Sequence, residues 1–117
     1  MKKTDDNLRR LIIALKRAGT KGEAPIWRDL SERLTKPIRG RPVINLSRLN
    51  RHTNKGETIV VPGKVLSTGE LSHKLTIAAL TFSEKARVKI TKAGGKTLSI
   101  EELVKKHPKG TDVRVMV

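Results

Sequence analysis

Uncompensated positive charge is concentrated between residues 33 and 55 of this chain. The segment holds seven lysines or arginines and no aspartate or glutamate. The seven are Arg33, Lys36, Arg39, Arg41, Arg48, Arg51 and Lys55. Guanidinium and ammonium groups form charge-assisted hydrogen bonds with phosphate oxygens. The chemistry that these residues can do is therefore the binding of a polyanion, and so much charge of one sign is unfavourable without an anionic partner.

Prolines and a glycine shape the backbone of this segment. Pro37 and Pro42 fix φ and lower the entropy that is lost when a bend is ordered. Gly40, between two arginines, lets the backbone approach a phosphate closely. We expect residues 36–42 to form an exposed bend that is mobile in the free chain and becomes ordered on its partner.

Catalytic and metal-binding patterns do not stand out in the sequence. Its three histidines lie far apart without metal-ligand spacing, and it has no cysteine. The stretch GTKGEAP at residues 19–25 lacks the lysine and hydroxyl pair of a phosphate-binding P-loop. His52 has no acidic residue near it in sequence, so solvation or contact with the anion explains it better than a general-base role. We therefore expect no enzyme, no cofactor and no bound metal.

The composition indicates one small domain with an aliphatic core. The chain has 117 residues and a net charge of +15, and leucine, isoleucine, valine and phenylalanine make 32 of its residues. That apolar share is above the level typical of disordered chains. No apolar run approaches the ~20 residues of a membrane span, and the N-terminus MKKTDDNLRR lacks the pattern of a signal peptide. We expect a soluble cytoplasmic protein without a membrane partner or a small-molecule substrate.

The kind of polyanion can be narrowed from the aromatic content. A membrane surface is less suitable, because the basic bend contains no aromatic residue and is interrupted by proline. The chain has one tryptophan, one phenylalanine and no tyrosine, too few for the stacking platforms that read single-stranded RNA. Folded nucleic acid, recognised through phosphates and shape, remains. DNA is not excluded, although no zinc-finger, basic-zipper or clear helix-turn-helix pattern is present.

Apolar spacing and turn residues predict a mixed α/β fold that positions this segment. Helices are expected at 5–18, 25–35, 47–53, 83–93 and 99–108, and strands at 43–46, 58–61, 75–81, 96–98 and 113–117. Trp27, Leu30 and Leu34 line the expected core face of the second helix. Gly19 is expected to end the first helix, and Pro62-Gly63 to form a turn after the strand at 58–61.

Two stretches of the sequence resemble known ribosomal families. PVINLSRLNRHTNKGETIVVPGKVLSTGEL, residues 42–71, closely resembles the signature of the large-subunit ribosomal protein family L-eighteen-e of archaea and eukaryotes. Residues 63–100 are also similar to the C-terminal domain of the related bacterial ribosomal protein L-fifteen. The similarity to the first family covers nearly the whole chain. Ile44 is a small departure from the residues that the family often shows before Asn45.

The resemblance implies a structural protein of the large ribosomal subunit, without catalysis. Its implied partners are large-subunit ribosomal RNA and neighbouring ribosomal proteins, and its implied fold is an irregular β-β-α superhelix preceded by two N-terminal helices. We expect one domain, 1–117, with the N-terminal helices at 1–36, the basic RNA-contacting segment at 37–57 and the β-β-α core at 58–117. The expected RNA contacts are Lys36, Arg39, Arg41, Asn45, Ser47, Arg48, Arg51, His52, Thr53, Lys55, Lys64 and Lys74. A free-standing RNA-binding chaperone or regulator, and an enzyme acting on RNA, are the alternatives.

Overall fold

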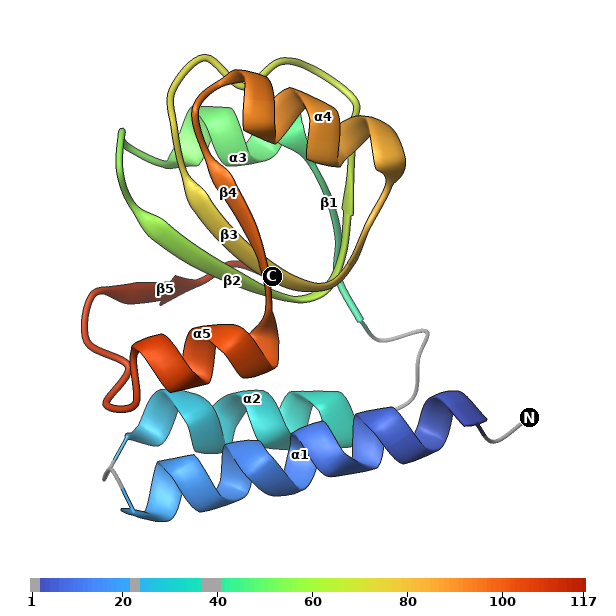
Figure 1. Ribbon diagram of the computed structural model, residues 1–117, viewed down its shortest axis with the longest axis vertical. Helices are drawn as coiled ribbons and strands as arrows, with labels where there is room; N and C mark the ends of the chain where they lie inside the picture. The colour runs from blue at the N-terminus through green and yellow to red at the C-terminus, as the bar shows by residue number, and fades with distance from the viewer. Residues whose placement is uncertain (1–2, 22–23, 37–40) are drawn as a thin grey trace.

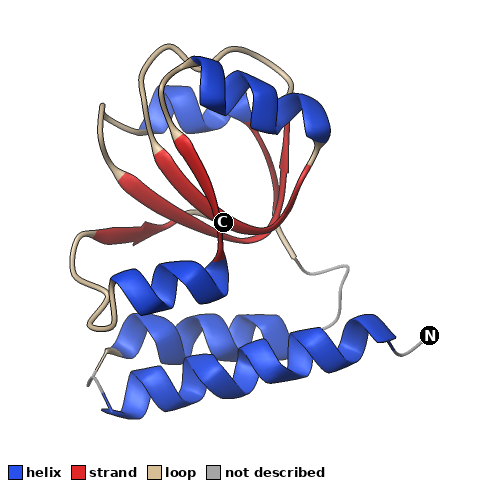
Figure 2. Cartoon of the chain, viewed as in Figure 1, coloured by secondary structure: helices blue, strands red, loops and turns tan. Residues whose placement is uncertain are grey.

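The computed structural model describes residues 3–21, 24–36 and 41–117. In chain order the elements are α1 (Lys3–Lys21), α2 (Pro25–Thr35), β1 (Val43–Asn45), α3 (Leu46–His52), β2 (Thr58–Leu66), β3 (Thr76–Phe82), α4 (Glu84–Lys92), β4 (Lys96–Ser99), α5 (Ile100–Lys106) and β5 (Val113–Val115). Two N-terminal helices are followed by short strands that alternate with helices (Figures 1 and 2). The prediction of a mixed α/β fold is confirmed.

All strand pairs in the sheet are parallel, and β2 is its central strand. The order is β1-β2-β3-β4, with β5 also paired to β2. The strand β5 pairs with Thr58–Val60 and β1 pairs with 64–66, so both occupy the edge of β2 opposite β3. A gap at residues 61–63 separates them along this edge.

Side chains alternate along β2 and β3 and divide the apolar residues between two cores. Ile59 and Val61 of β2 lie in one core with the buried residues of α3 and α4. Val60, between them, lies in the other core with α1, α2 and α5. The sheet is therefore covered by α3 and α4 on one face and by α2 and α5 on the other, where α1 packs against α2 and α5 and adds to the same core (Figure 1). The strand expected to be half-buried, β3, has Ile77, Ala78 and Ala79 all buried, because both of its faces are covered.

The helix α2 carries the tryptophan of the core that contains Val60 and the buried residues of α1, α2 and α5. Trp27, Leu30 and Leu34 are buried, as predicted. The indole Nε1 of Trp27 donates hydrogen bonds to the backbone oxygens of His107 at 3.2 Å and Pro108 at 2.9 Å. Burial of a tryptophan requires a partner for its N–H, and these two bonds attach the end of α5 to α2.

Two predicted chain breaks are wrong, each because of a close approach by another segment. Gly19 does not end α1, which continues to Lys21, and a side chain at this position would overlap Arg28 of α2. The pair Pro62-Gly63 is not a turn but part of β2, where the register with β3 shifts between Val61 and Lys64. A proline is tolerated at such an irregularity, and a side chain on Gly63 would overlap the carbonyl oxygen of Pro42.

Local capping signals were predicted correctly at α5. The hydroxyl of Ser99 accepts a hydrogen bond from the backbone N–H of Glu102 at 3.1 Å, and the Glu102 carboxylate accepts one from the backbone N–H of Ser99 at 2.9 Å. The hydrogen bond from the backbone N–H of Ser99 to the carboxylate, and after it the Ser99 side chain, lower the pKa of Glu102 below its ordinary value. The two reciprocal hydrogen bonds fix the start of α5, and Leu103 of this helix lies in the core that contains Trp27.

Candidate nucleic-acid interface

The expected RNA-contacting segment, residues 37–57, begins outside the described residues and continues through β1 and α3. The expected bend at 36–42 includes Pro37, Arg39 and Gly40, which lie outside the described residues. Its described members are Lys36, Arg41 and Pro42, of which Lys36 is exposed and the other two are half-buried. From Val43 onward the segment has a defined place in the fold.

The helix α3 separates its apolar residues from its cations. Leu46 and Leu49 are fully buried in the core that contains Ile59 and Val61 of β2. With those residues inward, Arg48, Arg51 and His52 are exposed on the outer side. The expected sharing of one helix face by the two arginines therefore agrees with their exposure.

Neutral polar residues of the same segment fasten it to the loop between β2 and β3. Asn45 accepts a hydrogen bond from the backbone N–H of Thr68 at 3.3 Å. Asn50 accepts bonds from the backbone N–H and the hydroxyl of Ser72, both at 2.9 Å. The side-chain oxygens of Asn45 and Asn50 thus hold α3 against residues 67–73.

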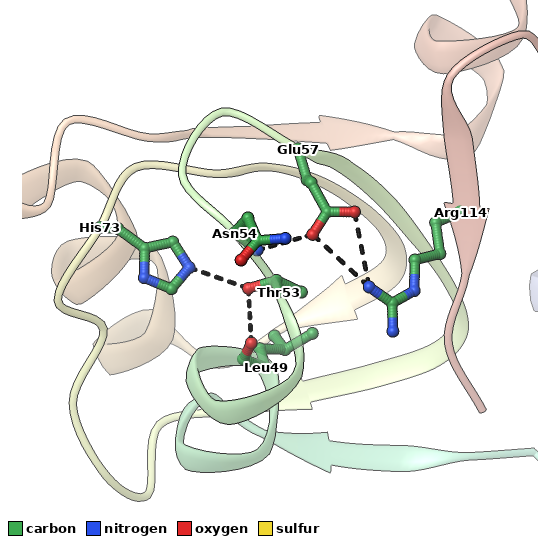
Figure 3. Close-up of polar contacts among 6 residues, drawn as sticks. All are labelled: Leu49, Thr53, Asn54, Glu57, His73 and Arg114. Atoms are coloured by element: carbon green, nitrogen blue, oxygen red, sulfur yellow. Dashed lines mark hydrogen bonds and ion pairs between the residues drawn. The ribbon is translucent and has the colours of Figure 1, made fainter.

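Thr53 adds a further contact between the end of α3 and the loop, through His73. Its hydroxyl is buried and donates to the backbone oxygen of Leu49 at 2.6 Å (Figure 3). Because a hydroxyl has one hydrogen, the contact of 2.9 Å with Nε2 of His73 is one in which the imidazole N–H donates. The Thr53 side chain therefore has its hydrogen bonds inside the protein.

A glycine allows the loop to lie directly on the start of α3. Gly69 has φ of 91°, a left-handed conformation, and a side chain there would overlap Ser47. Ser47 donates its backbone N–H to the oxygen of Thr68 at 3.0 Å. This packing gives Gly69 a backbone role and makes Ser47 half-buried.

The cations expected to contact RNA form no ion pair within the described part of the chain. The three ion pairs found there are Arg33–Asp29, Lys89–Glu70 and Arg114–Glu57. The expected contact residues outside these pairs are Lys36, Arg41, Arg48, Arg51, Lys55, Lys64 and Lys74. All but half-buried Arg41 are exposed. Charge on this surface therefore remains available to a partner.

The expected contacts do not all lie around α3. Lys55 follows α3, and the backbone oxygen of Lys74 accepts a bond from the N–H of the adjacent Gly56 at 2.9 Å, so these two lysines are close in the chain's fold. Lys64 lies on β2 beside β1, where its backbone N–H donates to Pro42 at 3.1 Å. The structure thus brings Lys74 next to the basic segment from twenty residues away.

Two hollows border the end of the chain, and cationic side chains line both. One has a volume of about 300 Å³ and is lined by Arg33, Lys36, Arg41, Pro42, Pro62 and Val117. The other has a volume of about 280 Å³ and is lined by Arg48, His52, Arg114, Val115, Met116 and Val117. Arg114 was not among the predicted residues. Its proximity to α3 depends on the pairing of β5 with β2, for which the sequence around it carries no local signal.

Comparison with known proteins identifies the family. The sequence profile described as "Ribosomal protein 60S L18 and 50S L18e" matches residues 1–117. The chain belongs to this family of ribosomal proteins. It is similar to a protein named large ribosomal subunit protein eL18 from Archaeoglobus fulgidus, with 46% identity over 117 residues and all of both chains covered.

Two further relatives with the same name support the L18e assignment. The protein from Methanoregula boonei is 47% identical over 116 residues, covering 99% of this chain and 96% of its own. The protein from Methanothermobacter thermautotrophicus is 40% identical over 114 residues, covering 97% of this chain and 94% of its own. The predicted resemblance is confirmed along the full length. An L18e protein is a structural constituent of the large ribosomal subunit and not an enzyme.

Other classes of site have no support in residues 3–21, 24–36 and 41–117. No group of three or more histidine, cysteine or acidic side chains there could hold a metal ion. None of the helices described combines the length and the apolar content that a membrane crossing requires.

Proposed function

We propose that this L18e protein binds folded large-subunit ribosomal RNA through phosphate contacts on a surface centred on α3. The observation that supports it most strongly is that, in one segment, neutral side chains make the internal hydrogen bonds while arginines are exposed. Asn45, Asn50 and Thr53 make the internal hydrogen bonds. Arg48 and Arg51, one turn apart on the same helix, are exposed and outside the described ion pairs. Exposed guanidinium groups outside the ion pairs suit phosphate binding, and Arg48 keeps further donors beside the one it gives to the backbone oxygen of Val117.

The expected contact residues then have two roles. We assign phosphate contact to the cationic or titratable side chains, namely Lys36, Arg39, Arg41, Arg48, Arg51, His52, Lys55, Lys64 and Lys74. Arg39 is included on its place in the sequence motif alone. Asn45 and Thr53 have a positioning role, because their side chains are bonded to residues 67–73 or to Leu49. Ser47 stays among the proposed RNA contacts, since only its backbone N–H is bonded, to Thr68.

The rest of the chain would act as the scaffold of this surface. We infer that residues 1–117 form one domain, in which the parallel strands with α3 and α4 constitute the β-β-α superhelix of the family. The two cores that meet at β2 and β3 support this inference, because the residues of the N-terminal helices and of the later helices and strands share cores on the two faces of one sheet. Neighbouring ribosomal proteins are the expected second class of partner.

A salt titration of RNA binding tests the proposed mechanism. If about five cations meet phosphates, the logarithm of the affinity falls against the logarithm of the salt concentration with a slope of about −4. The measurement uses the purified chain and transcribed domains of large-subunit ribosomal RNA. Binding that is independent of salt would contradict phosphate contact as its basis.

Sedimentation distinguishes a ribosomal component from a free-standing RNA chaperone. The protein is expected to stay with large subunits in a sucrose gradient after a wash at moderate salt concentration. Release into the top fractions under that wash, with the subunits intact, would favour the chaperone alternative.

A further inference from the structure

The hollow between α3 and β5 brings two arginines and a histidine together from distant parts of the chain. Arg48 and His52 come from α3, four residues apart, and Arg114 comes from β5. The six described residues that line it include no acid. Its apolar lining comes from Val115 and from Met116, which is buried.

Both arginines retain hydrogen-bond donors toward this hollow. Arg48 donates through Nη2 to the backbone oxygen of Val117 at 2.6 Å. Arg114 approaches the Glu57 carboxylate through Nη1 alone, at 3.4 and 3.5 Å. A guanidinium has five N–H donors, so each arginine uses a minority of them in these contacts.

The pair between Arg114 and Glu57 is a weak one that orients the arginine. The two side chains are 49% and 29% exposed, and exposed pairs of this length contribute little to stability. Glu57 accepts a shorter bond, 2.6 Å, from the backbone N–H of Asn54 at the end of the α3 segment (Figure 3). Glu57 is therefore bonded to the turn that follows α3 and lies beside Arg114.

The size of the hollow favours one group of a larger ligand over a free small molecule. Small-molecule sites have volumes of roughly 300–1,000 Å³ and surround most of their ligand. At about 280 Å³ this hollow is at or below that range, and its lining joins the α3 surface through Arg48 and His52. A phosphate group that projects from a bound nucleic-acid backbone meets both conditions.

We propose that this hollow receives one phosphodiester group of the bound RNA, and that Arg114 is a phosphate contact. The phosphate oxygens accept hydrogen bonds from Arg48 and Arg114, and His52 lies at the same opening. The proposal rests on the proposed function, since it places one particular phosphate on the α3 surface. It adds to that surface a residue from β5, far outside the basic segment.

Neutralisation of Arg114 provides the first test. Arg114→Gln is expected to flatten the salt slope of binding to a large-subunit ribosomal RNA domain by about one unit. The matched control is Arg87→Gln, which removes the same charge from α4, where Arg87 lies over the ring of Phe82. An equal change of slope in both variants would overturn the proposal. The double variant E57Q/R114Q leaves no unpaired carboxylate and gives the same readout if the single variant does not fold.

Phosphate-ethylation interference on the RNA gives a direct readout of the contact. Ethylation of one phosphate is expected to weaken binding of the unaltered chain, and to weaken binding of Arg114→Gln clearly less, because only the contact with Arg48 remains there to be lost. An identical interference pattern for the two chains would overturn the placement in the hollow. In that case a pattern that still changes with Arg48→Gln and Arg51→Gln would leave the α3 surface supported, so the two proposals fail separately.

Neutralisation of Glu57 gives a change in the opposite direction. Glu57→Gln keeps the oxygen that accepts from Asn54 but frees Arg114 from its carboxylate, so RNA affinity is expected to rise about two- to fivefold. Glu70→Gln removes an equal charge from the pair with Lys89 and serves as the control. Equal gains for both variants would show a general charge effect and contradict the hollow as a site.

Discussion

The short helices α3 and α4 lie on the same face of the sheet, and both are basic, yet they use their cations differently. In α4, Lys89 donates to the backbone oxygens of Ser67 at 3.0 Å and Gly69 at 2.8 Å. Arg87 of the same helix lies 5.0 Å above the ring of Phe82 and donates to Thr97 at 3.3 Å. In α3 the loop is held by a neutral residue, Asn50, and both arginines are exposed, although Arg48 also donates to the backbone oxygen of Val117 at 2.6 Å.

Side chains from both helices, and from Asn45 just before α3, form hydrogen bonds with the same loop, residues 67–73. Residues 67–73 receive hydrogen bonds or donate them to Asn45 and Asn50 on the α3 side and to Lys89 on the α4 side. A positive charge that serves as a structural donor is already satisfied and contributes little to binding a polyanion. Lys85 and Lys92 of α4 are nevertheless exposed and outside the described ion pairs. The proposal of α3 as the binding surface therefore rests also on the run of cations without acids at residues 33–55.

The largest effect is expected from the apolar anchor of α3. Leu49→Ala should lower the free energy of unfolding by about 2–5 kcal/mol, because it leaves a cavity in a fully buried site. Urea denaturation followed by circular dichroism measures it. A loss below about 1 kcal/mol would show that α3 is not held by the core, and the comparison of two anchored helices would no longer apply.

A smaller effect on stability is expected from the structural lysine of α4. Lys89→Ala should lower the free energy of unfolding by about 1–3 kcal/mol, because the oxygens of Ser67 and Gly69 lose their donor. The salt slope of RNA binding should not change. If the slope flattens by a full unit, as expected for an arginine of α3, then Lys89 contacts RNA and the two helices do not differ.

The smallest effect is expected at the buried hydroxyl of α3. Thr53→Val keeps the shape of the side chain but removes the bonds to Leu49 and His73, at a cost of about 1 kcal/mol of unfolding free energy. Thr53→Ser, which retains the hydroxyl, is the control. A reduced salt slope for Thr53→Val in folded protein would assign this residue a role in phosphate contact beyond positioning.

Sequence patterns predicted those features of the fold that depend on neighbouring residues. The capping box of Ser99 and Glu102 and the inward placement of Leu46 and Leu49 follow from local spacing, and both are observed. The continuation of β2 through Pro62-Gly63 could not be predicted this way. It depends on β1 and β5, which pair on either side of this point and come from before and after β2 in the chain.

In the candidate site, likewise, features that depend on local spacing could be predicted and those that depend on long-range contacts could not. The exposure of Arg48 and Arg51 follows from the helical spacing of the leucines between and beside them. The position of Arg114 depends on strand pairing across 57 residues of sequence from Glu57, and the use of Lys89 by a loop depends on packing of α4. Neither long-range contact leaves a periodic trace in the residues around it.

A comparison of matched charge removals from the two helices tests the central claim most directly. One variant carries Arg48→Gln with Arg51→Gln, and the other carries Lys85→Gln with Lys92→Gln, which are exposed cations of α4. Both lose two charges from the same face of the sheet. Salt titrations of binding to a large-subunit ribosomal RNA domain should show a slope flattened by about two units for the α3 variant and nearly unchanged for the α4 variant. Equal flattening in the two variants would mean that RNA responds to net charge alone, and the assignment of the binding surface to α3 would be wrong.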